Sequence, residues 1–118
     1  MPFMNVITET ECTRAQMNTL KAGVAAILEE VLDKPERGVF VTFSHMDGFY
    51  RAGEYTTDSA ILDLKYIGEF DLQVKQELTK KLCELFRDEL GCDPEKIIVP
   101  ITEKVSANWG RRFGNYKG

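Results

Sequence analysis

The chain has 118 residues and a mass of 13.4 kDa, with 43% hydrophobic and 29% charged residues. These values are typical of one globular domain whose core needs no metal or disulfide, and they exclude a disordered chain. Fifteen basic and nineteen acidic residues give a net charge of −4, which argues against a nucleic-acid-binding domain. No apolar run reaches the roughly 18 residues of a membrane span, and no signal-peptide pattern is present. We therefore expect a cytoplasmic protein, with secretion without a signal peptide as the alternative.

The first part of the chain reads as strand, helix and strand. A short apolar run from Phe3 to Thr8 predicts a buried strand. The following helix is expected to begin near the capping residues Thr10 and Thr13 and to end before Pro35. Val39 to Ser44 predicts a second strand. The apolar stripe of the helix, at spacings of three and four, consists of Met17, Leu20, Val24, Ile27, Leu28, Val31 and Leu32.

The second part repeats this order after a polar, glycine-containing segment. Asp47 to Thr57 predicts a loop or a short hairpin, and Ala60 to Ile67 predicts a third strand. A second helix is expected from about Asp71 to Leu90, with Gly91 as its C-cap. Ile97 to Ile101 predicts the fourth strand. The apolar stripe of this helix consists of Val74, Leu78, Leu82, Leu85, Phe86 and Leu90.

The two parts also share a short sequence motif. Pro35-Glu36-Arg37 stands before the strand Val39 to Ser44, and Pro94-Glu95-Lys96 stands before the strand that starts at Ile97. The motif falls at the same structural place twice, which indicates an internal duplication of a β-α-β unit.

The duplication predicts an α/β fold of the α+β kind with a four-stranded mixed sheet. We expect a single domain over 1–118, built of pseudo-repeats at about 2–46 and 58–102 with a C-terminal tail at 103–118. Right-handed crossovers place both helices on one face of the sheet. Because no further helix is available for the other face, oligomerisation is expected to cover it.

Familiar catalytic and metal-binding motifs are absent. Three cysteines, an odd number without C-x-x-C spacing, are expected to be reduced thiols, with Cys83 buried. His45 is either a catalytic base or a histidine at a strand end, and the second interpretation is favoured. No spacing selects an acid–base pair among the carboxylates, so we interpret them as solvated charge: Glu9, Glu11, Asp47 and Glu54.

The chain opens with Met1-Pro2. Methionine before a small residue is normally removed, which would make Pro2 a rigid secondary amine. Burial lowers the pKa of such an amine toward neutrality, where a general base works best. If Met1 is retained, the nitrogen of Pro2 is an amide and cannot act as a base.

Short motifs along the whole chain resemble those of the macrophage migration inhibitory factor and D-dopachrome tautomerase family, within the tautomerase superfamily. Their order and spacing carry the resemblance more than any one of them does. The matching pieces are Pro2 at the start of a strand, Lys34-Pro35, Ala60 leading to Ile67-Gly68, Pro94-Glu95-Lys96-Ile97 and Asn108-Trp109-Gly110.

The resemblance implies a keto–enol tautomerase of the phenylpyruvate or dopachrome type. Pro2 would be the catalytic base, and Lys34 would hold the carboxylate or carbonyl oxygen of the substrate. Ile67 would line the pocket through its backbone, and Trp109 would form an aromatic wall. The family implies a homotrimer with sites at subunit boundaries, and we expect neither a cofactor nor a metal.

The chain also departs from the family pattern. Ile98 and Pro100 stand where mammalian members have tyrosine and asparagine, and Gly38 stands where an aromatic residue is expected. The Cys-x-x-Cys motif of the mammalian proteins is absent. Arg111 and Arg112 follow the tryptophan and either bind an anionic substrate or are solvated charge, the second being favoured.

Two alternatives to tautomerisation remain open. One is a cytokine-like trimer that binds a receptor and uses the fold without relevant catalysis. The other is a different proline-based reaction, such as hydration, dehalogenation or decarboxylation, which generally needs arginines near the base. The predicted small-molecule partner is a keto or enol carboxylate or an aryl substrate.

Overall fold

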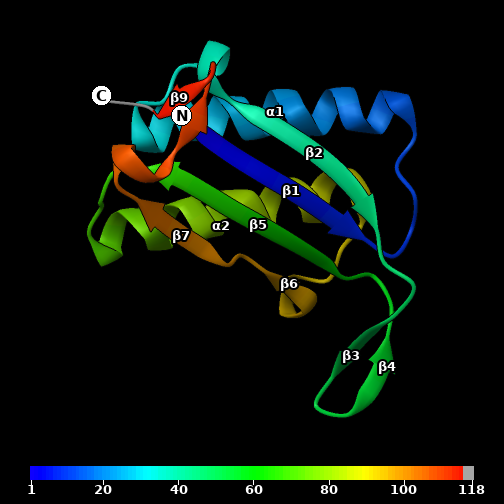
Figure 1. The fold of residues 1–118 in the computed structure, drawn as a ribbon. Coiled ribbons are helices and arrows are strands. Elements are labelled where there is room, and N and C mark those ends of the chain that lie inside the picture. The colour runs from blue at the N-terminus through cyan, green and yellow to red at the C-terminus, as the bar shows by residue number, and fades with distance from the viewer. Residues whose placement is uncertain (116–118) are drawn as a thin grey trace.

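A computed structural model describes residues 1–115 of the chain as a mixed sheet backed by two long helices (Figure 1). The last part of the predicted tail, 116–118, lies outside the described residues. The strands are β1 (Pro2–Thr8), β2 (Phe40–His45), β3 (Phe49–Arg51), β4 (Glu54–Thr56), β5 (Ala60–Ile67), β6 (Ile97–Ile98), β7 (Ile101–Lys104), β8 (Gly110–Arg111) and β9 (Gly114–Asn115). The helices are α1 (Arg14–Leu32), α2 (Leu72–Leu90) and the short 3-10 helices η1 (Glu36–Gly38), η2 (Pro94–Lys96) and η3 (Ser106–Asn108).

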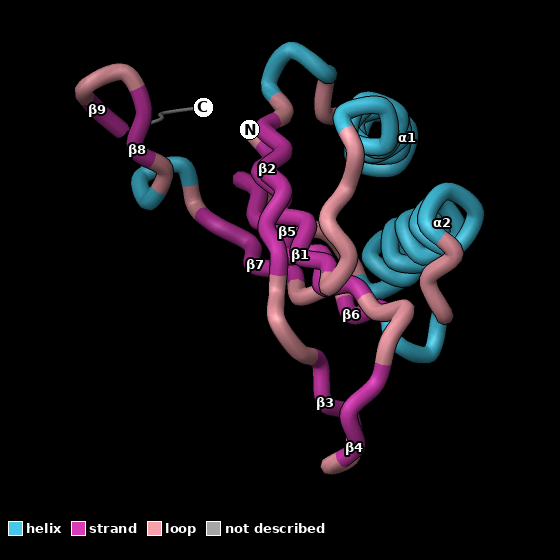
Figure 2. The backbone as a smooth tube through the Cα atoms, turned by 90° about the vertical axis from the view of Figure 1, so that its right-hand side faces the viewer, coloured by secondary structure: helices cyan, strands magenta, loops and turns pink. Residues whose placement is uncertain are grey.

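The main sheet consists of two β-α-β units joined at its centre. Its strand order is β2-β1-β5-β6, with β7 also beside β5. β1 pairs with β2 in parallel and β5 pairs with β6 and β7 in parallel, whereas β1 and β5 are antiparallel. Both long helices lie on one face of the sheet (Figure 2). The predicted fold class, with its duplicated units and mixed sheet, is confirmed.

The fourth strand differs from the prediction. Instead of one strand from Ile97 to Ile101, β6 and β7 lie in line beside β5, with the ladder interrupted at Val99 and Pro100. Proline has no backbone N–H to donate, so the ladder cannot continue through it. The carbonyl of Pro100 still accepts a hydrogen bond from the backbone N–H of Leu64 at 3.0 Å, and the register is the same on both sides.

The repeated Pro-Glu-basic motif forms a turn of 3-10 helix in both units. Before each turn, the long helix ends in a left-handed residue, Asp33 with φ 56° and Gly91 with φ 71°. The N–H of each cap donates to carbonyls of the last helical turn, which satisfies groups that the helix leaves open. At the other end of α1, Thr13 and Gln16 form a capping box, so the helix starts after Thr13 and not after Thr10.

The core lies between the helices and the inner face of the sheet. Alternate residues of β1 and β5 point toward the helices, as the strict alternation of buried and half-buried side chains shows. Gly23 lets the helices approach closely, because a Cβ there would lie 2.7 Å from Leu85 Cδ1. The largest fully buried side chains include Tyr66, Phe86, Met4, Leu20, Leu28, Leu62, Leu64, Leu78 and Leu82.

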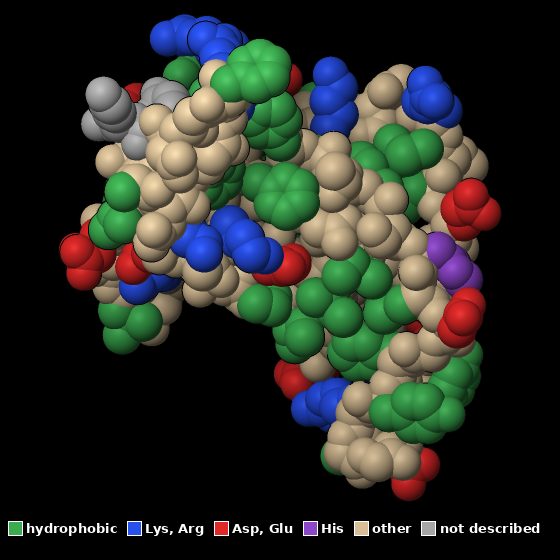
Figure 3. All heavy atoms as spheres, in the orientation of Figure 1, with side chains coloured by type: hydrophobic (Ala, Val, Ile, Leu, Met, Phe, Trp, Pro, Cys, Tyr) green, Lys and Arg blue, Asp and Glu red, His purple; other side chains and the backbone are tan. Residues whose placement is uncertain are grey.

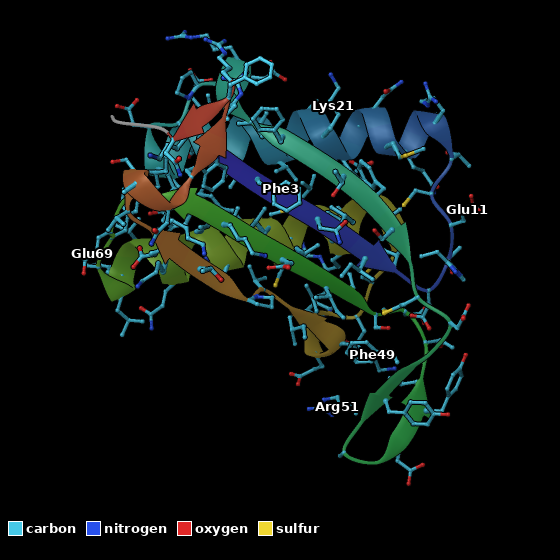
Figure 4. The ribbon with its side chains drawn as sticks, viewed as in Figure 1. Phe3, Glu11, Lys21, Phe49, Arg51 and Glu69 are labelled. Atoms are coloured by element: carbon cyan, nitrogen blue, oxygen red, sulfur yellow. The ribbon has the colours of Figure 1, made fainter. Side chains whose placement is uncertain are left out.

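The opposite face of the sheet is uncovered in the single chain. Hydrophobic side chains gather on it (Figure 3), and Phe3 projects from its centre (Figure 4). Phe40 at one edge and Ile98 at the other are 41% and 47% exposed. Polar side chains share this face, among them Asn5, which accepts hydrogen bonds from the hydroxyls of Thr42 and Ser44. Exposed apolar side chains gathered in this way are typical of an interaction surface.

The remaining predicted features fall outside the core. The segment after β2 forms the β3–β4 hairpin, which extends away from the sheet (Figure 1). Cys92, not Cys83, is the buried cysteine, because Cys83 is only half-buried on α2. No helix within the described part of the chain combines the length and apolar character that crossing a membrane requires.

A polar network ties β7 to β5 and α2. Glu103 Oε2 accepts hydrogen bonds from the buried Tyr66 hydroxyl and from the backbone N–H of Phe70, each at 2.8 Å. Lys75 Nζ lies 3.4 Å from Glu103 Oε1. Desolvation by burial raises the pKa of the Glu103 carboxyl, but the hydrogen bonds and the charge of Lys75 together leave it below its usual value.

We predict that Glu103→Gln lowers the free energy of unfolding by about 1–2 kcal/mol at neutral pH. The native pKa of Glu103 is lowered, so its stabilisation is present above the unfolded pKa and is lost as pH falls through the native pKa. Urea denaturation across a series of acidic buffers measures this difference. Glu89→Gln, at an exposed position of α2, is the matched control. A pH-independent difference between wild type and Glu103→Gln would contradict the prediction.

Candidate functional site

The predicted site residues Pro2, Lys34 and Ile67 converge on one pocket of about 370 Å³. Because β1 and β5 are antiparallel, the start of β1 lies beside the end of β5. The turn after α1 and the β8–β9 hairpin complete the walls. Residues that line the pocket include Pro2, Lys34, Gly38, Ile67, Arg111 and Arg112. A wider groove of about 730 Å³, between α1 and β2, contains no predicted site residue.

Lys34 is fixed at the end of β5 by a hydrogen bond. Its Nζ donates to the backbone carbonyl of Ile67 at 2.7 Å. The left-handed cap at Asp33 turns the chain out of α1 immediately before this lysine. A lysine ammonium has three donors, so two of them remain available to a bound molecule after the bond to Ile67. The side chain therefore serves as a positioned cation at the pocket.

Pro2 is buried close to the hydrogen bond between Lys34 and Ile67. It is fully buried in β1 and pairs with Tyr66, the neighbour of Ile67. The α-amino group of Met1, one residue earlier, has a pKa below its usual value because burial disfavours its charged form and because Lys34 is nearby. This end of β1 therefore favours a neutral amine.

The side chain of Met1 lies beside Gly38. A Cβ on Gly38 would lie 3.4 Å from the sulfur of Met1. Gly38 stands where the family pattern has an aromatic residue. In the chain that retains Met1, the methionine side chain takes up the space beside it. Removal of Met1 would free that space and would expose the nitrogen of Pro2.

Arginines that the sequence analysis favoured as solvated charge lie at this pocket. Arg111 and Arg112 come from the β8–β9 hairpin, and Arg37 comes from η1. The guanidinium of Arg111 lies over the ring of Phe40, 5.3 Å from its centroid, and this cation–π contact links the hairpin to β2. Arg37 belongs to the repeated Pro35-Glu36-Arg37 motif, and no pattern in the sequence predicts that it lies at this pocket.

Other candidate residues lie elsewhere. Trp109 caps η3 and is half-buried, but it does not line this pocket, so its predicted role stays a prediction. His45 is an exposed histidine at the end of β2, with Nδ1 3.6 Å from Asp47 Oδ1. Within residues 1–115, no group of three or more His, Cys, Asp or Glu side chains is arranged to hold a metal.

Glu9 corrects one interpretation from the sequence. Its Oε1 accepts hydrogen bonds from the backbone N–H and the hydroxyl of Ser59, at 2.7 and 2.6 Å, so it is not a solvated charge. Its Oε2 is buried and has no hydrogen-bond partner among the described residues. This contact joins residues 50 positions apart, and no local pattern predicts it.

Comparisons with known proteins agree with this architecture. Residues 1–113 match the family described as macrophage migration inhibitory factor (MIF). A comparison with curated proteins gave no match.

Solved structures share the fold at low sequence identity. Macrophage migration inhibitory factor of Toxoplasma gondii has a TM-score of 0.87 at 18% identity, covering 97% of this chain and 99% of that one. A fused 4-OT described as a wild-type symmetric trimer has a TM-score of 0.84 at 18% identity, covering 97% and 94%. N1, a member of the cis-3-chloroacrylic acid dehalogenase family, has a TM-score of 0.84 at 16% identity, covering 98% and 83%.

We predict that Lys34→Met raises the pKa of the α-amino group of Met1. The substitution keeps a side chain of similar length but removes the positive charge that disfavours the ammonium form. NMR titration of the full chain with labelled Met1 measures the pKa. Lys80→Met, at an exposed position of α2, should leave the pKa unchanged. An equal pKa in wild type and Lys34→Met would show that Lys34 does not act on the amine.

Proposed function

The chain belongs to the macrophage migration inhibitory factor family, and we propose that it is a keto–enol tautomerase that uses Pro2 as its general base. The observation that carries the proposal is the convergence of Pro2, Lys34 and the Ile67 carbonyl in one pocket. The lowered pKa of an amine at this place supports it, because a base must be neutral at working pH.

The proposed reaction moves one proton. After removal of Met1, the lone pair of the Pro2 nitrogen takes a proton from the carbon next to the substrate carbonyl. The C–H electron pair forms a C=C bond, and the carbonyl π electrons move to oxygen, which gives an enolate. The proton on the Pro2 nitrogen is then delivered to that oxygen, which yields the enol and restores the neutral amine, and the reverse sequence yields the ketone. No cofactor takes part in this sequence.

Lys34 has the electrostatic role in this proposal. Its ammonium group, held by the Ile67 carbonyl at 2.7 Å, is placed before the substrate arrives. A preorganised cation of this kind stabilises the negative charge that develops on the enolate oxygen, or binds the carboxylate next to it. Because its bond to Ile67 uses only one donor, both contacts are chemically available.

We further propose that the active form is a homotrimer. The uncovered apolar face of the sheet needs a partner surface, and the fused 4-OT with the same fold is a symmetric trimer. A closed symmetric assembly would bury this face on every subunit. It would also remove the exposed edges at β2 and at β6.

A second reaction is favoured by one specific observation. Proline-based hydration and dehalogenation generally need arginines near the base. Arg111 and Arg112 line the Pro2 pocket. A dehalogenase-family protein also shares the fold. Chloride release from cis-3-chloroacrylate, measured on the same preparation as tautomerisation, distinguishes the two functions.

We expect Pro2→Ala to lower kcat/KM for phenylpyruvate tautomerisation by about 100-fold or more, the usual contribution of a general base. The assay uses protein whose loss of Met1 has been verified by mass spectrometry. Activity in the wild type should fall as pH decreases through the pKa of the amine, because protonation removes the lone pair.

The matched control is the wild-type chain that retains Met1. It differs by Met1 alone, which makes the nitrogen of Pro2 an amide and takes up space beside Gly38, so we expect it to be inactive. Equal activity in the processed wild type and Pro2→Ala would overturn the proposed role of Pro2, and so would full activity in the Met1-retaining form.

Analytical ultracentrifugation tests the trimer. We expect a mass three times the 13.4 kDa of the chain. Ile98→Glu places a charge on the uncovered face and should shift the population toward monomer. Leu72→Glu, which changes an exposed residue at the start of α2, is the control. A wild-type monomer at micromolar concentration would contradict the proposal.

A further inference from the structure

The pocket at Pro2 has a charge opposite to that of the whole protein. The chain has a net charge of −4, yet four cations line this one pocket: Lys34, Arg37, Arg111 and Arg112. Asp33 is the single carboxylate among the residues that line it. Like charges gathered in a confined space repel each other, so an anionic ligand would relieve a cost that the free protein carries.

The arginines of the pocket are also available to a ligand. Within residues 1–115, no ion pair involves Arg37, Arg111 or Arg112. The guanidinium of Arg111 lies 5.3 Å from the ring centroid of Phe40, and this contact uses none of its N–H donors for a hydrogen bond.

The turn that presents Arg112 is conformationally unusual. β8 and β9 are joined by two residues, Arg112 and Phe113, with φ values of 56° and 65°. Two-residue turns with both residues left-handed favour Asn and Gly, whereas Arg and Phe are strained there. Phe113 is fully exposed, so its packing does not explain the turn. Strained residues of this kind cluster at binding and active sites, although the β3–β4 hairpin also has a non-glycine left-handed residue, Ala52.

Within the single chain, the pocket offers charged partners to a polar ligand and no aromatic wall to an aryl group. Its apolar lining comes from Met1, Pro2, Pro35 and Ile67, of which the last three remain after removal of Met1, and none of the described residues that line it is aromatic. Trp109 lies outside the lining. With Met1 in place the pocket has a volume of about 370 Å³, which is at the small end of ligand pockets and suits a small anion.

We propose that the preferred substrate is a small dicarboxylate with a 2-keto or 2-enol group, ahead of an arylpyruvate. This inference rests on the proposed tautomerase function for the placement of the first carboxylate at Lys34. The second carboxylate is bound by Arg111 and Arg112 from the tail hairpin. Arg111 and Arg112 are thus the residues that determine substrate specificity, and the planar guanidinium groups suit carboxylate recognition.

The test compares two ligands of the same shape in protein whose loss of Met1 has been verified by mass spectrometry. Fumarate and crotonate share a trans four-carbon skeleton, but crotonate has a methyl group in place of the second carboxylate. Isothermal titration calorimetry should show fumarate binding at least about tenfold more tightly, the usual effect of charge-assisted hydrogen bonds. Arg111→Gln and Arg112→Gln should each weaken fumarate binding about five- to tenfold and change crotonate binding less than twofold.

Two control variants make the comparison specific. Arg112→Lys keeps the charge and should retain part of the fumarate preference. Arg87→Gln removes an arginine that pairs with Asp88 on α2 and should change neither affinity. Equal affinity for both ligands, no binding of fumarate, or an equal loss of both ligands in Arg112→Gln would overturn the inference.

The binding experiment does not depend on turnover. If phenylpyruvate tautomerisation depends on Pro2 but fumarate binds no better than crotonate, the substrate inference fails and the proposed function stands. If fumarate is preferred through Arg111 and Arg112 but no turnover depends on Pro2, the proposed function fails and the dicarboxylate site stands.

Discussion

The antiparallel pairing of β1 with β5 is the constraint on which the rest of the structure depends. Each strand already has a parallel partner within its own β-α-β unit, so this pairing alone joins the two halves of the sheet. It also decides where the site lies. Because the strands run in opposite directions, Pro2 at the start of one lies opposite Tyr66 at the end of the other. The carbonyl of Ile67 then meets Lys34. If β1 and β5 were parallel, Pro2 and Ile67 would lie at opposite ends of the strands.

The duplicated scaffold uses equivalent positions for different purposes. In both units a left-handed helix cap leads into a proline and a turn of 3-10 helix. The residue before the proline is Lys34 in the first unit and Asp93 in the second. Asp93 accepts a hydrogen bond from the backbone N–H of Glu95 and so caps its own turn. Lys34 instead extends to β5. The scaffold is therefore nearly symmetric, whereas the chemical groups on it are not.

Prediction from the sequence succeeded for helices and strands whose hydrophobic residues recur at regular spacing. The bounds of β5 agree with the predicted strand, and α2 ends where Gly91 predicted. It failed where the outcome depended on contacts distant in sequence. Glu9 was interpreted as solvated, but it binds Ser59 from another segment. The break before β7 could have been predicted, because Pro100 has no N–H to donate to a strand ladder. It was missed because Pro100 lies within an apolar run, which predicts one continuous strand.

The sequence by itself determined the two β-α-β units and their repeated turns, because each follows from neighbours within a few residues. Tertiary structure alone decided that Arg111 and Arg112 lie beside the pocket of Pro2. The physical reason is the order and direction of the strands. They are set by the packing of the whole core, and they bring together the two ends of the chain, which no local pattern of residues relates.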